Sequence, residues 1–180
     1  VTCVAEAVGP SGRYIHYGMT SSDVLDTALS VQVKKAAEVL LDGFDRMDAA
    51  LLKLIEKHTF TLTAGRTHGI HAEATTFGFK LAGFAMEFRR TRERFERAVA
   101  QFARAKLSGA VGTYSTQPPE VEELVAKELG LEVESVATQV IPRDRHAELM
   151  WSLAMIGAAI ERLSVELRHL QRTEVGEVVE

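Results

Sequence analysis

The feature that most limits how this chain can fold is the recurrence of apolar residues every three or four positions along three long segments. Such spacing places the side chains in one stripe along an α-helix. The first stripe consists of Leu25, Leu29, Val33, Ala36, Leu40, Phe44, Met47, Leu51 and Ile55. Residues 20–23, just before it, supply hydroxyls that can cap a helix and an aspartate that suits its first turn.

Two further stripes predict two more long helices. They consist of Phe77, Leu81, Phe84, Phe88, Thr91, Phe95, Ala98 and Phe102, and of Leu149, Leu153, Ile156, Ile160, Leu163, Leu167 and Leu170. The sequence thus predicts long helices over about 22–58, 73–106 and 143–174, a short helix over about 119–129, and the end of a preceding segment over 1–20. Because strand signals are few, the predicted fold class is all-α, a bundle of long helices.

The third stripe differs from the others because residues 149–160 are apolar nearly all round. A stretch of this length is too short to cross a bilayer, so it is better explained as a helix contacted on several sides within a bundle. Met150 and Trp151 are therefore expected in a core or a subunit interface. Two neighbouring helices give such a helix too little cover, which points to self-association.

Charge argues against two classes of partner. The second predicted helix carries several arginines, but they alternate with glutamates, and opposite charges four residues apart describe a solvated face with internal ion pairs. Three such pairs are Arg89–Glu93, Arg92–Glu96 and Glu93–Arg97. The net charge of -4 and the pI near 5.9 give no electrostatic reason to expect nucleic acid or an anionic membrane as a partner.

The single cysteine is informative about the cellular compartment. Cys3 has no partner for an intrachain disulfide, which fits a reducing compartment. The first residues carry neither the basic stretch nor the long apolar run of a signal peptide. We therefore expect a cytoplasmic protein.

Residues 65–78, with the sequence GRTHGIHAEATTFG, form the strongest candidate for chemistry and are expected to be a loop between two helices. Gly65 and Gly69 free the backbone around Thr67 and His68, as a close approach to a ligand requires. His68 is the natural acid or base because the pKa of an unperturbed histidine lies near neutrality. A lone histidine in such a loop is, however, more often structural than catalytic.

A metal site is not expected in this segment. His68 and His71 are three residues apart, whereas helical zinc sites place histidines four apart and add a third ligand. The chain has no cysteine cluster and no glycine-rich phosphate loop of a standard pattern. No metal and no organic cofactor is therefore predicted.

Thr20 and Ser21 are a second candidate site. At a helix N-terminus they offer hydroxyls, free backbone N–H groups and the positive end of the helix dipole, all of which suit a carboxylate. On the sequence alone, simple capping of the helix is the better explanation of the same residues.

The segment 65–78 resembles the Thr-His segment of the adenylosuccinate lyase family, in the fumarase/aspartase superfamily. Two other blocks agree with this resemblance, in the order and at the spacing of the family. They are HYGMTSSDVLDTA at 16–28, and TQVIPRDRHAE at 138–148 with LRHLQRTEVGEV at 167–178. One departure is Ala74, where the family usually has proline after Ala-Glu. The resemblance identifies the chain as part of the central helical domain of such a lyase.

The resemblance implies an activity and roles for single residues. A lyase of this family eliminates fumarate from adenylosuccinate, giving AMP, and from the succinylated aminoimidazole carboxamide ribotide of purine biosynthesis. His68 matches the family's general acid on the leaving nitrogen. Residues matching substrate contacts are Thr20, Ser21, Thr67 and Gln139, and His16 is expected to line the same site. His71 receives no role.

The resemblance also implies partners and missing parts. Lyases of this family form homotetramers whose active sites combine residues of three subunits. Their general base is a serine on a loop with a Gly-Ser-Ser run and a Met-Pro-His-Lys stretch, and neither occurs here. We expect an N-terminal domain before Val1 and the catalytic loop after Glu180, so this segment alone should be inactive.

Two alternatives remain open at this point. Another superfamily member, such as an argininosuccinate lyase or a carboxymuconate cycloisomerase, would share the fold. The local sequences TSSDVLDTA and QVIPRDRHAE argue against both of these enzymes. A non-catalytic helical segment that only forms the core of an assembly would also retain these helices.

Overall fold

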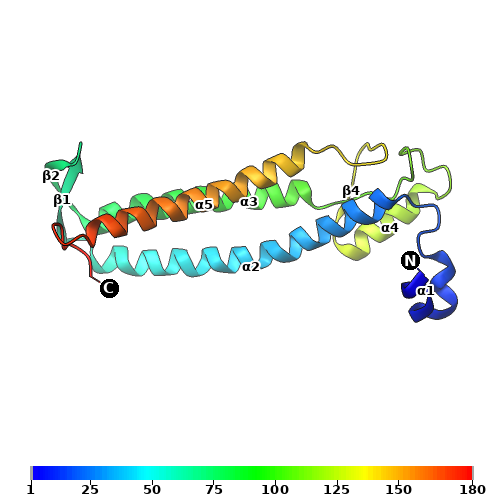
Figure 1. Cartoon of the computed structure of the whole chain (residues 1–180), viewed down its shortest axis with the longest axis horizontal. Helices are drawn as coiled ribbons and strands as arrows, with labels where there is room; N and C mark the ends of the chain where they lie inside the picture. The colour runs from blue at the N-terminus through cyan, green and yellow to red at the C-terminus, as the bar shows by residue number, and fades with distance from the viewer. Residues whose placement is uncertain (1, 180) are drawn as a thin grey trace. The chain divides into compact units, whose positions relative to one another are not determined.

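The computed structural model describes residues 2–179 and divides the chain into two compact units, each of which is described by itself. One unit comprises Val1–Ala36 and Val99–His146, and the other Ala37–Ala98 and Ala147–Glu180. The elements in chain order are α1 (Thr2–Val8), the 3-10 helix η1 (Gly9–Tyr14), α2 (Ser21–Lys57), β1 (Leu62–Thr67), β2 (Ile70–Thr76), α3 (Phe77–Phe102), β3 (Arg104–Ala105), α4 (Pro119–Leu129), β4 (Glu132–Val133) and α5 (Asp144–Leu170) (Figure 1). Helices dominate, which confirms the predicted all-α class.

The start of α2 shows how the sequence sets a helix boundary. The Oδ2 atom of Asp23 accepts a hydrogen bond from the backbone N of Thr20 at 2.9 Å. This contact is one half of a capping box, and it joins the residue before the helix to its first turn. The carboxylate of Asp23, and not the expected hydroxyl, therefore ties down this end of α2.

The range predicted for the second long helix, 73–106, is wrong at both ends. Residues 70–76 pair with β1 as an antiparallel hairpin, and α3 begins only at Phe77, where Oγ1 of Thr76 accepts from N of Phe79 at 3.2 Å. At the other end, β3 pairs in parallel with β4. Backbone pairing with another segment outweighs helix propensity at both ends.

The third long helix is also shorter than the predicted range 143–174, because α5 ends at Leu170. Gly176 has a φ of 59°, a left-handed conformation that glycine adopts without strain. The chain reverses there, so that N of Glu177 donates to the carbonyl oxygen of Leu170 at 3.0 Å. This contact satisfies a carbonyl that the helix end would leave free.

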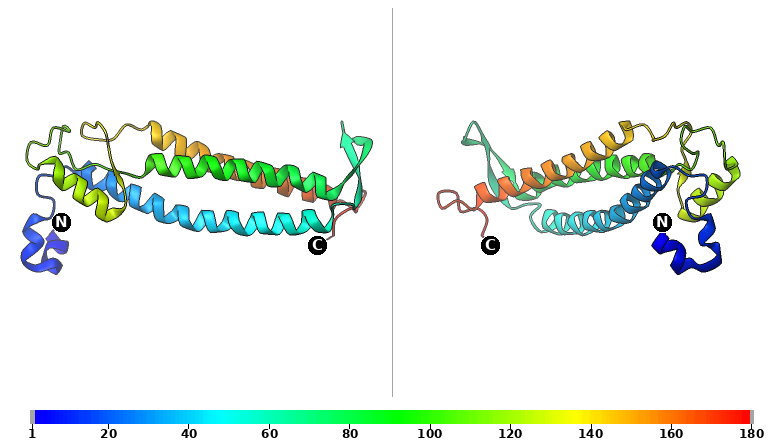
Figure 2. Two further views of the ribbon diagram at one scale, coloured as in Figure 1. Left: turned by 180° about the vertical axis from the view of Figure 1, so that it is seen from behind. Right: turned by 45° about the vertical axis from the view of Figure 1, so that its right-hand side comes forward.

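In the second unit, α2, α3 and α5 lie side by side (Figures 1 and 2). Buried apolar side chains from all three form its core: Phe44, Leu51, Leu81, Phe84, Phe88, Phe95 and Leu163. Polar pairs join the same helices. The predicted pair of Arg92 with Glu96 is present at 2.9 Å, whereas Arg89 pairs with Asp48 of α2 at 2.7 Å. Arg89 and Arg92 are thus the arginines of α3 that pair with acidic side chains. Among the described residues, the predicted pairs of Glu93 with Arg89 and with Arg97 are not present.

Large apolar side chains of α5 are exposed on more than one side of the helix. Met150 is 64% exposed, Trp151 50% and Ile160 46%, so a core location for Met150 and Trp151 is wrong within this chain. A subunit interface remains a prediction for them. Of the helices in the described part of the chain, none is long and apolar enough to cross a membrane.

The first unit has its own small core. Ala105, Leu107, Ala126 and Leu131 are buried there against half-buried Met19 and Val31, among others. Gly130, with a φ of 63°, ends α4 in the left-handed conformation, and N of Leu131 donates to the carbonyl of Ala126 at 2.8 Å. This packing brings the loop after β3 close to the start of α2.

Candidate active site

His68 lies at the tip of the hairpin formed by β1 and β2. Thr67 pairs with Ile70, so His68 and Gly69 form a two-residue loop, with φ values of 54° and 76°. Positive φ at both positions defines a type I′ turn, which joins twisted strands well. Histidine tolerates this conformation better than most residues, and glycine adopts it freely. The predicted loop is therefore a hairpin that presents Thr67 and His68 to solvent.

Gly65 has a different reason to be glycine. A Cβ atom at this position would lie 2.6 Å from the carbonyl oxygen of Glu73 on the opposite strand. The register of the hairpin shifts between Ala64 and Arg66, which marks an irregularity of the bulge type at this point. Gly65 thus permits the close approach of β1 and β2 below the tip.

An acidic residue after α5 holds the same hairpin. Glu177 accepts a hydrogen bond from Oγ1 of Thr63 at 2.7 Å and forms an ion pair with Arg66. The Arg66 guanidinium, followed by the Thr63 hydroxyl, lowers the pKa of Glu177 to about 2. The guanidinium of Arg66 also lies 3.5 Å from Nε2 of His71. His71, which had no predicted role, is therefore part of this polar cluster.

Four predicted site residues lie in the first unit. Nε2 of Gln139 lies 3.5 Å from Oγ1 of Thr20, at the limit of a hydrogen bond, and Ser21 follows as the first residue of α2. His16 has a φ of 67°, and its carbonyl oxygen accepts from N of Met19 at 3.2 Å. Ser21 and Gln139 are exposed, while His16 and Thr20 are half-buried. The structure thus gathers hydroxyl and amide groups at the N-terminus of α2.

A buried ion pair connects the segments that carry these hydroxyl and amide groups. Nζ of Lys106 lies 2.5 Å from Oδ1 of Asp23, 2.7 Å from the carbonyl oxygen of Gly109 and 3.0 Å from that of Gln139. Lys106 therefore joins the first turn of α2 to the segment that carries Gln139. Both side chains of the pair are almost completely buried.

The six predicted residues thus fall into two sets. His16, Thr20, Ser21 and Gln139 belong to the first unit, and Thr67 and His68 belong to the hairpin of the second. Sequence reasoning missed Lys106 and Glu177. Lys106 lay inside the predicted helix 73–106, and the only signal at Glu177 was its place in the third block of the resemblance.

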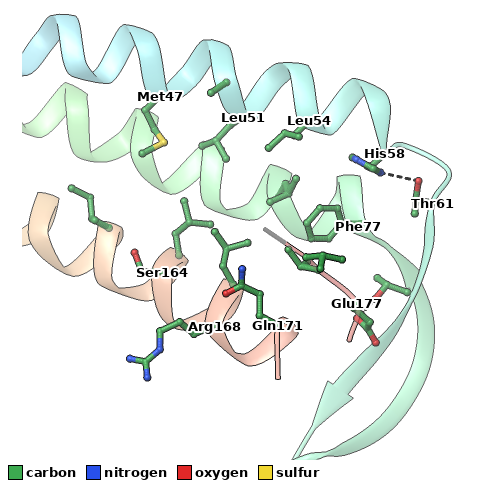
Figure 3. Close-up of a pocket in the computed structure, with 18 of the residues that line it drawn as sticks. Met47, Leu51, Leu54, His58, Thr61, Phe77, Ser164, Arg168, Gln171 and Glu177 are labelled. Atoms are coloured by element: carbon green, nitrogen blue, oxygen red, sulfur yellow. Dashed lines mark hydrogen bonds between the residues drawn. The ribbon is translucent and has the colours of Figure 1, made fainter. Parts of the chain in front are cut away.

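A cavity of about 880 Å³ in the second unit adjoins the polar cluster below the hairpin tip, because Thr63 and Glu177 are among the residues that line it (Figure 3). Apolar side chains such as Met47, Leu51 and Leu54 from α2 line it, and His58 lies at its edge, where Nδ1 is 3.1 Å from Oγ1 of Thr61. Its wall is mostly apolar, which does not suit a substrate with several charges. The predicted site residues are not among those that line it.

Over residues 2–179, no three His, Cys, Asp or Glu side chains lie close enough together to hold a metal ion.

The profile of a family described as Lyase matches residues 2–180, and the chain belongs to this lyase family. Adenylosuccinate lyase of Aquifex aeolicus is 49% identical over 180 residues, which are 100% of this chain and 41% of that protein. This similarity confirms the resemblance seen in the sequence blocks. The chain spans about two fifths of the length of the curated relatives it matches.

Solved structures agree on the fold. The crystal structure of fumarate lyase from Mesorhizobium sp. BNC1 is similar with a TM-score of 0.91 and 33% identity, over 98% of this chain and 42% of that one. That of 3-carboxy-cis,cis-muconate lactonizing enzyme from Pseudomonas putida has a TM-score of 0.89 and 27% identity, over 97% of this chain and 41% of that one.

Proposed function

We propose that the full-length protein is an adenylosuccinate lyase, which eliminates fumarate from adenylosuccinate to give AMP. The same enzyme would release fumarate from the succinylated aminoimidazole carboxamide ribotide in purine biosynthesis. The observation that carries this proposal is the 49% identity to the Aquifex aeolicus adenylosuccinate lyase along the whole chain. Identity to the muconate lactonizing enzyme is only 27%, so the similarity favours the activity of an adenylosuccinate lyase over that of a muconate lactonizing enzyme.

His68 would act as the general acid of the elimination. A base removes a proton from the carbon next to the one that bears the nitrogen, and the electron pair of this C–H bond becomes the C=C bond of fumarate. The C–N bond breaks at the same time, and its electron pair stays on the leaving nitrogen. His68 gives this nitrogen a proton, so that it leaves as a neutral amine. Support comes from the exposed position of the imidazole at the hairpin tip and from the two-residue loop that holds its backbone. The Gly-Ser-Ser run and the Met-Pro-His-Lys stretch expected around the base do not occur in this sequence, so we expect the segment alone to be inactive.

The remaining site residues would hold the substrate. Thr20, Ser21 and the free N–H groups at the start of α2 suit a substrate carboxylate, because the helix dipole places positive charge there. Gln139, close to Thr20, offers an amide that donates and accepts, and Thr67 precedes the acid on the hairpin. His16 would line the same site from the segment before α2. No metal or organic cofactor is part of this proposal.

Self-association to a homotetramer is the second part of the proposal. It is supported by the exposed apolar side chains of α5, namely Met150, Trp151 and Ile160. Met150 and Trp151 are neighbours on this surface, and exposed large apolar side chains that lie together mark protein interfaces. A cytoplasmic location is supported by Cys3, which is free and exposed.

The test is release of fumarate by the purified full-length protein from adenylosuccinate and, in parallel, from argininosuccinate. We expect rapid turnover of adenylosuccinate and none of argininosuccinate. The opposite preference would assign the chain to another lyase of the superfamily. Tetramers without activity on either substrate would support the assembly role instead.

A further inference from the structure

We propose that Glu177 is a positioning residue, which fixes the β1–β2 hairpin and thereby the place from which His68 delivers its proton. This inference rests on the proposed function, because it gives His68 the role of general acid. Glu177 has no contact with the tip itself and acts through Thr63 and Arg66.

The hairpin has little apolar anchorage of its own. Leu62 is 78% exposed and Ile70 66% exposed, so neither strand contributes these side chains to a core. At its base, N of Phe77 donates to the carbonyl of Thr61 at 2.9 Å, and N of Gly78 to that of His58 at 2.9 Å. A hairpin held only at its base would swing at the tip, since isolated two-stranded ribbons are marginally stable in water.

Glu177 supplies the missing contacts along β1. Its two carboxylate oxygens are used separately: Oε2 accepts from the hydroxyl of Thr63 at 2.7 Å, and Oε1 pairs with the guanidinium of Arg66. Arg66 is one residue away from Thr67 and reaches His71 on β2 as well. The contacts of Glu177 therefore extend to both strands just below the tip.

The carboxylate is itself held firmly. N of Glu177 and N of Val178 both donate to the carbonyl oxygen of Leu170, at 3.0 and 3.3 Å. Leu170 is the last residue of α5 and is buried. Glu177 thus connects the hairpin to the end of a core helix, which is rigid where the hairpin is not.

Partial burial makes this connection stronger than an ordinary surface pair. The side chains of Arg66 and Glu177 are only 25% and 27% exposed. Two oxygens engaged by two donors leave the carboxylate little freedom to rotate, and a bond between charged partners is stronger than a neutral one. The lowered pKa of Glu177 keeps it ionised at every pH at which such an enzyme would work.

The experiment compares Glu177→Gln with Glu174→Gln in the full-length protein. Glu174 is a matched control, because it is close in sequence, 76% exposed and 3.8 Å from Arg172. For Glu177→Gln we expect kcat to fall between about tenfold and a hundredfold with KM nearly unchanged, because a displaced catalytic group affects the chemical step. Hydrogen exchange of the amides of residues 62–76 should accelerate, while that of 37–57 stays the same. Glu174→Gln should match the wild type in both measurements.

Exchanging the charges of residues 66 and 177 keeps the test decisive if a single substitution lowers the yield of folded protein. The double variant with Glu177→Arg and Arg66→Glu restores an ion pair, and it should recover part of the kcat lost by either single variant. Wild-type kcat and unchanged exchange in Glu177→Gln would overturn the inference, as would a loss that appears only in KM. Full activity of His68→Ala would instead overturn the proposed function, and the exchange data would then report on the hairpin independently.

Discussion

Asp23 and Lys106 form a buried ion pair in which Oδ1 of the carboxylate lies 2.5 Å from Nζ of the ammonium. The other carboxylate oxygen accepts from N of Thr20 at 2.9 Å and from N of Gly109 at 3.2 Å. The ammonium also donates to the carbonyl of Gln139 at 3.0 Å. Two residues proposed to hold the substrate are thus attached through their backbones to the same buried pair.

Removing one partner of this pair should be costly. Lys106→Met leaves the carboxylate of Asp23 buried without its counter-charge, and we expect a loss of about 3–5 kcal/mol in the free energy of unfolding. Denaturant titration measures it, and exposed Lys53→Met on α2 is the control. A loss as small as that of the control would show that the pair does not support the fold.

Tyr114 should resist ionisation. Burial, followed by its hydrogen bond to the Glu122 carboxylate, raises the pKa of Tyr114 from 10.0 to about 12. Because the folded pKa is the higher one, its stabilising effect is fully present below pH 10 and is lost as the pH rises through about 12. Ultraviolet titration of the phenol, with Tyr114→Phe to identify its signal, measures this pKa. A titration at the usual value would contradict the buried contact with Glu122.

The contribution of Glu177 to stability has the opposite pH dependence, because it is lost at low pH. Its pKa is lowered from 4.5 to about 2, mainly by the hydrogen bond from Arg66 and then by that from Thr63. Its stabilising effect is therefore present above about pH 4.5 and is lost as the pH falls toward 2. Thermal unfolding of the wild type and Glu177→Gln should differ at neutral pH and converge at pH 2. Added salt should reduce the difference at neutral pH, since the pair is partly exposed. A constant difference across this range would contradict the assignment.

Substitution by alanine should change the unfolding free energy in opposite directions at two glycines, Gly112 and Gly157. In Gly112→Ala the new Cβ would lie 1.9 Å from the carbonyl oxygen of Ala137, at a φ of 80° that alanine disfavours. We expect a loss of roughly 3 kcal/mol or more in unfolding free energy. In Gly157→Ala, on α5, the new Cβ would have no atom within 4 Å apart from the nearby backbone of its own helix and its chain neighbours, so this change should stabilise by about 0.5–1 kcal/mol. Equal effects at both positions would contradict the geometry.

The sequence predicts the long helices well because their apolar stripes are long and regular. The range 22–58 differs from α2 by a single residue at each end, since Asp23 and Lys57 suit the helix termini. The hairpin was missed because its strands lack a regular alternation of apolar and polar residues, and Thr75 and Thr76 resemble a helix start. Gly69 after His68 was the available signal, since a glycine at the second position of a two-residue loop is typical of a type I′ turn.

Motifs predict the candidate site in part. They select residues with free polar groups, such as His68 and Gln139, because these residues lie in the sequence blocks that carry the resemblance. They do not reveal Lys106 or Glu177, which act through partners far away in the sequence, as the contacts of Lys106 with Asp23 and of Glu177 with Arg66 show. Such pairs depend on the packing of whole helices, which local patterns do not encode.

His68 is proposed to protonate the leaving nitrogen, and this role is measured by the kcat of His68→Ala for fumarate release from adenylosuccinate. In the full-length protein we expect kcat to fall by about 10²–10⁴, with the circular dichroism spectrum and oligomeric state unchanged. His169→Ala, an exposed histidine at the end of α5, should match the wild type. A His68→Ala enzyme within about twofold of wild-type kcat would contradict the account.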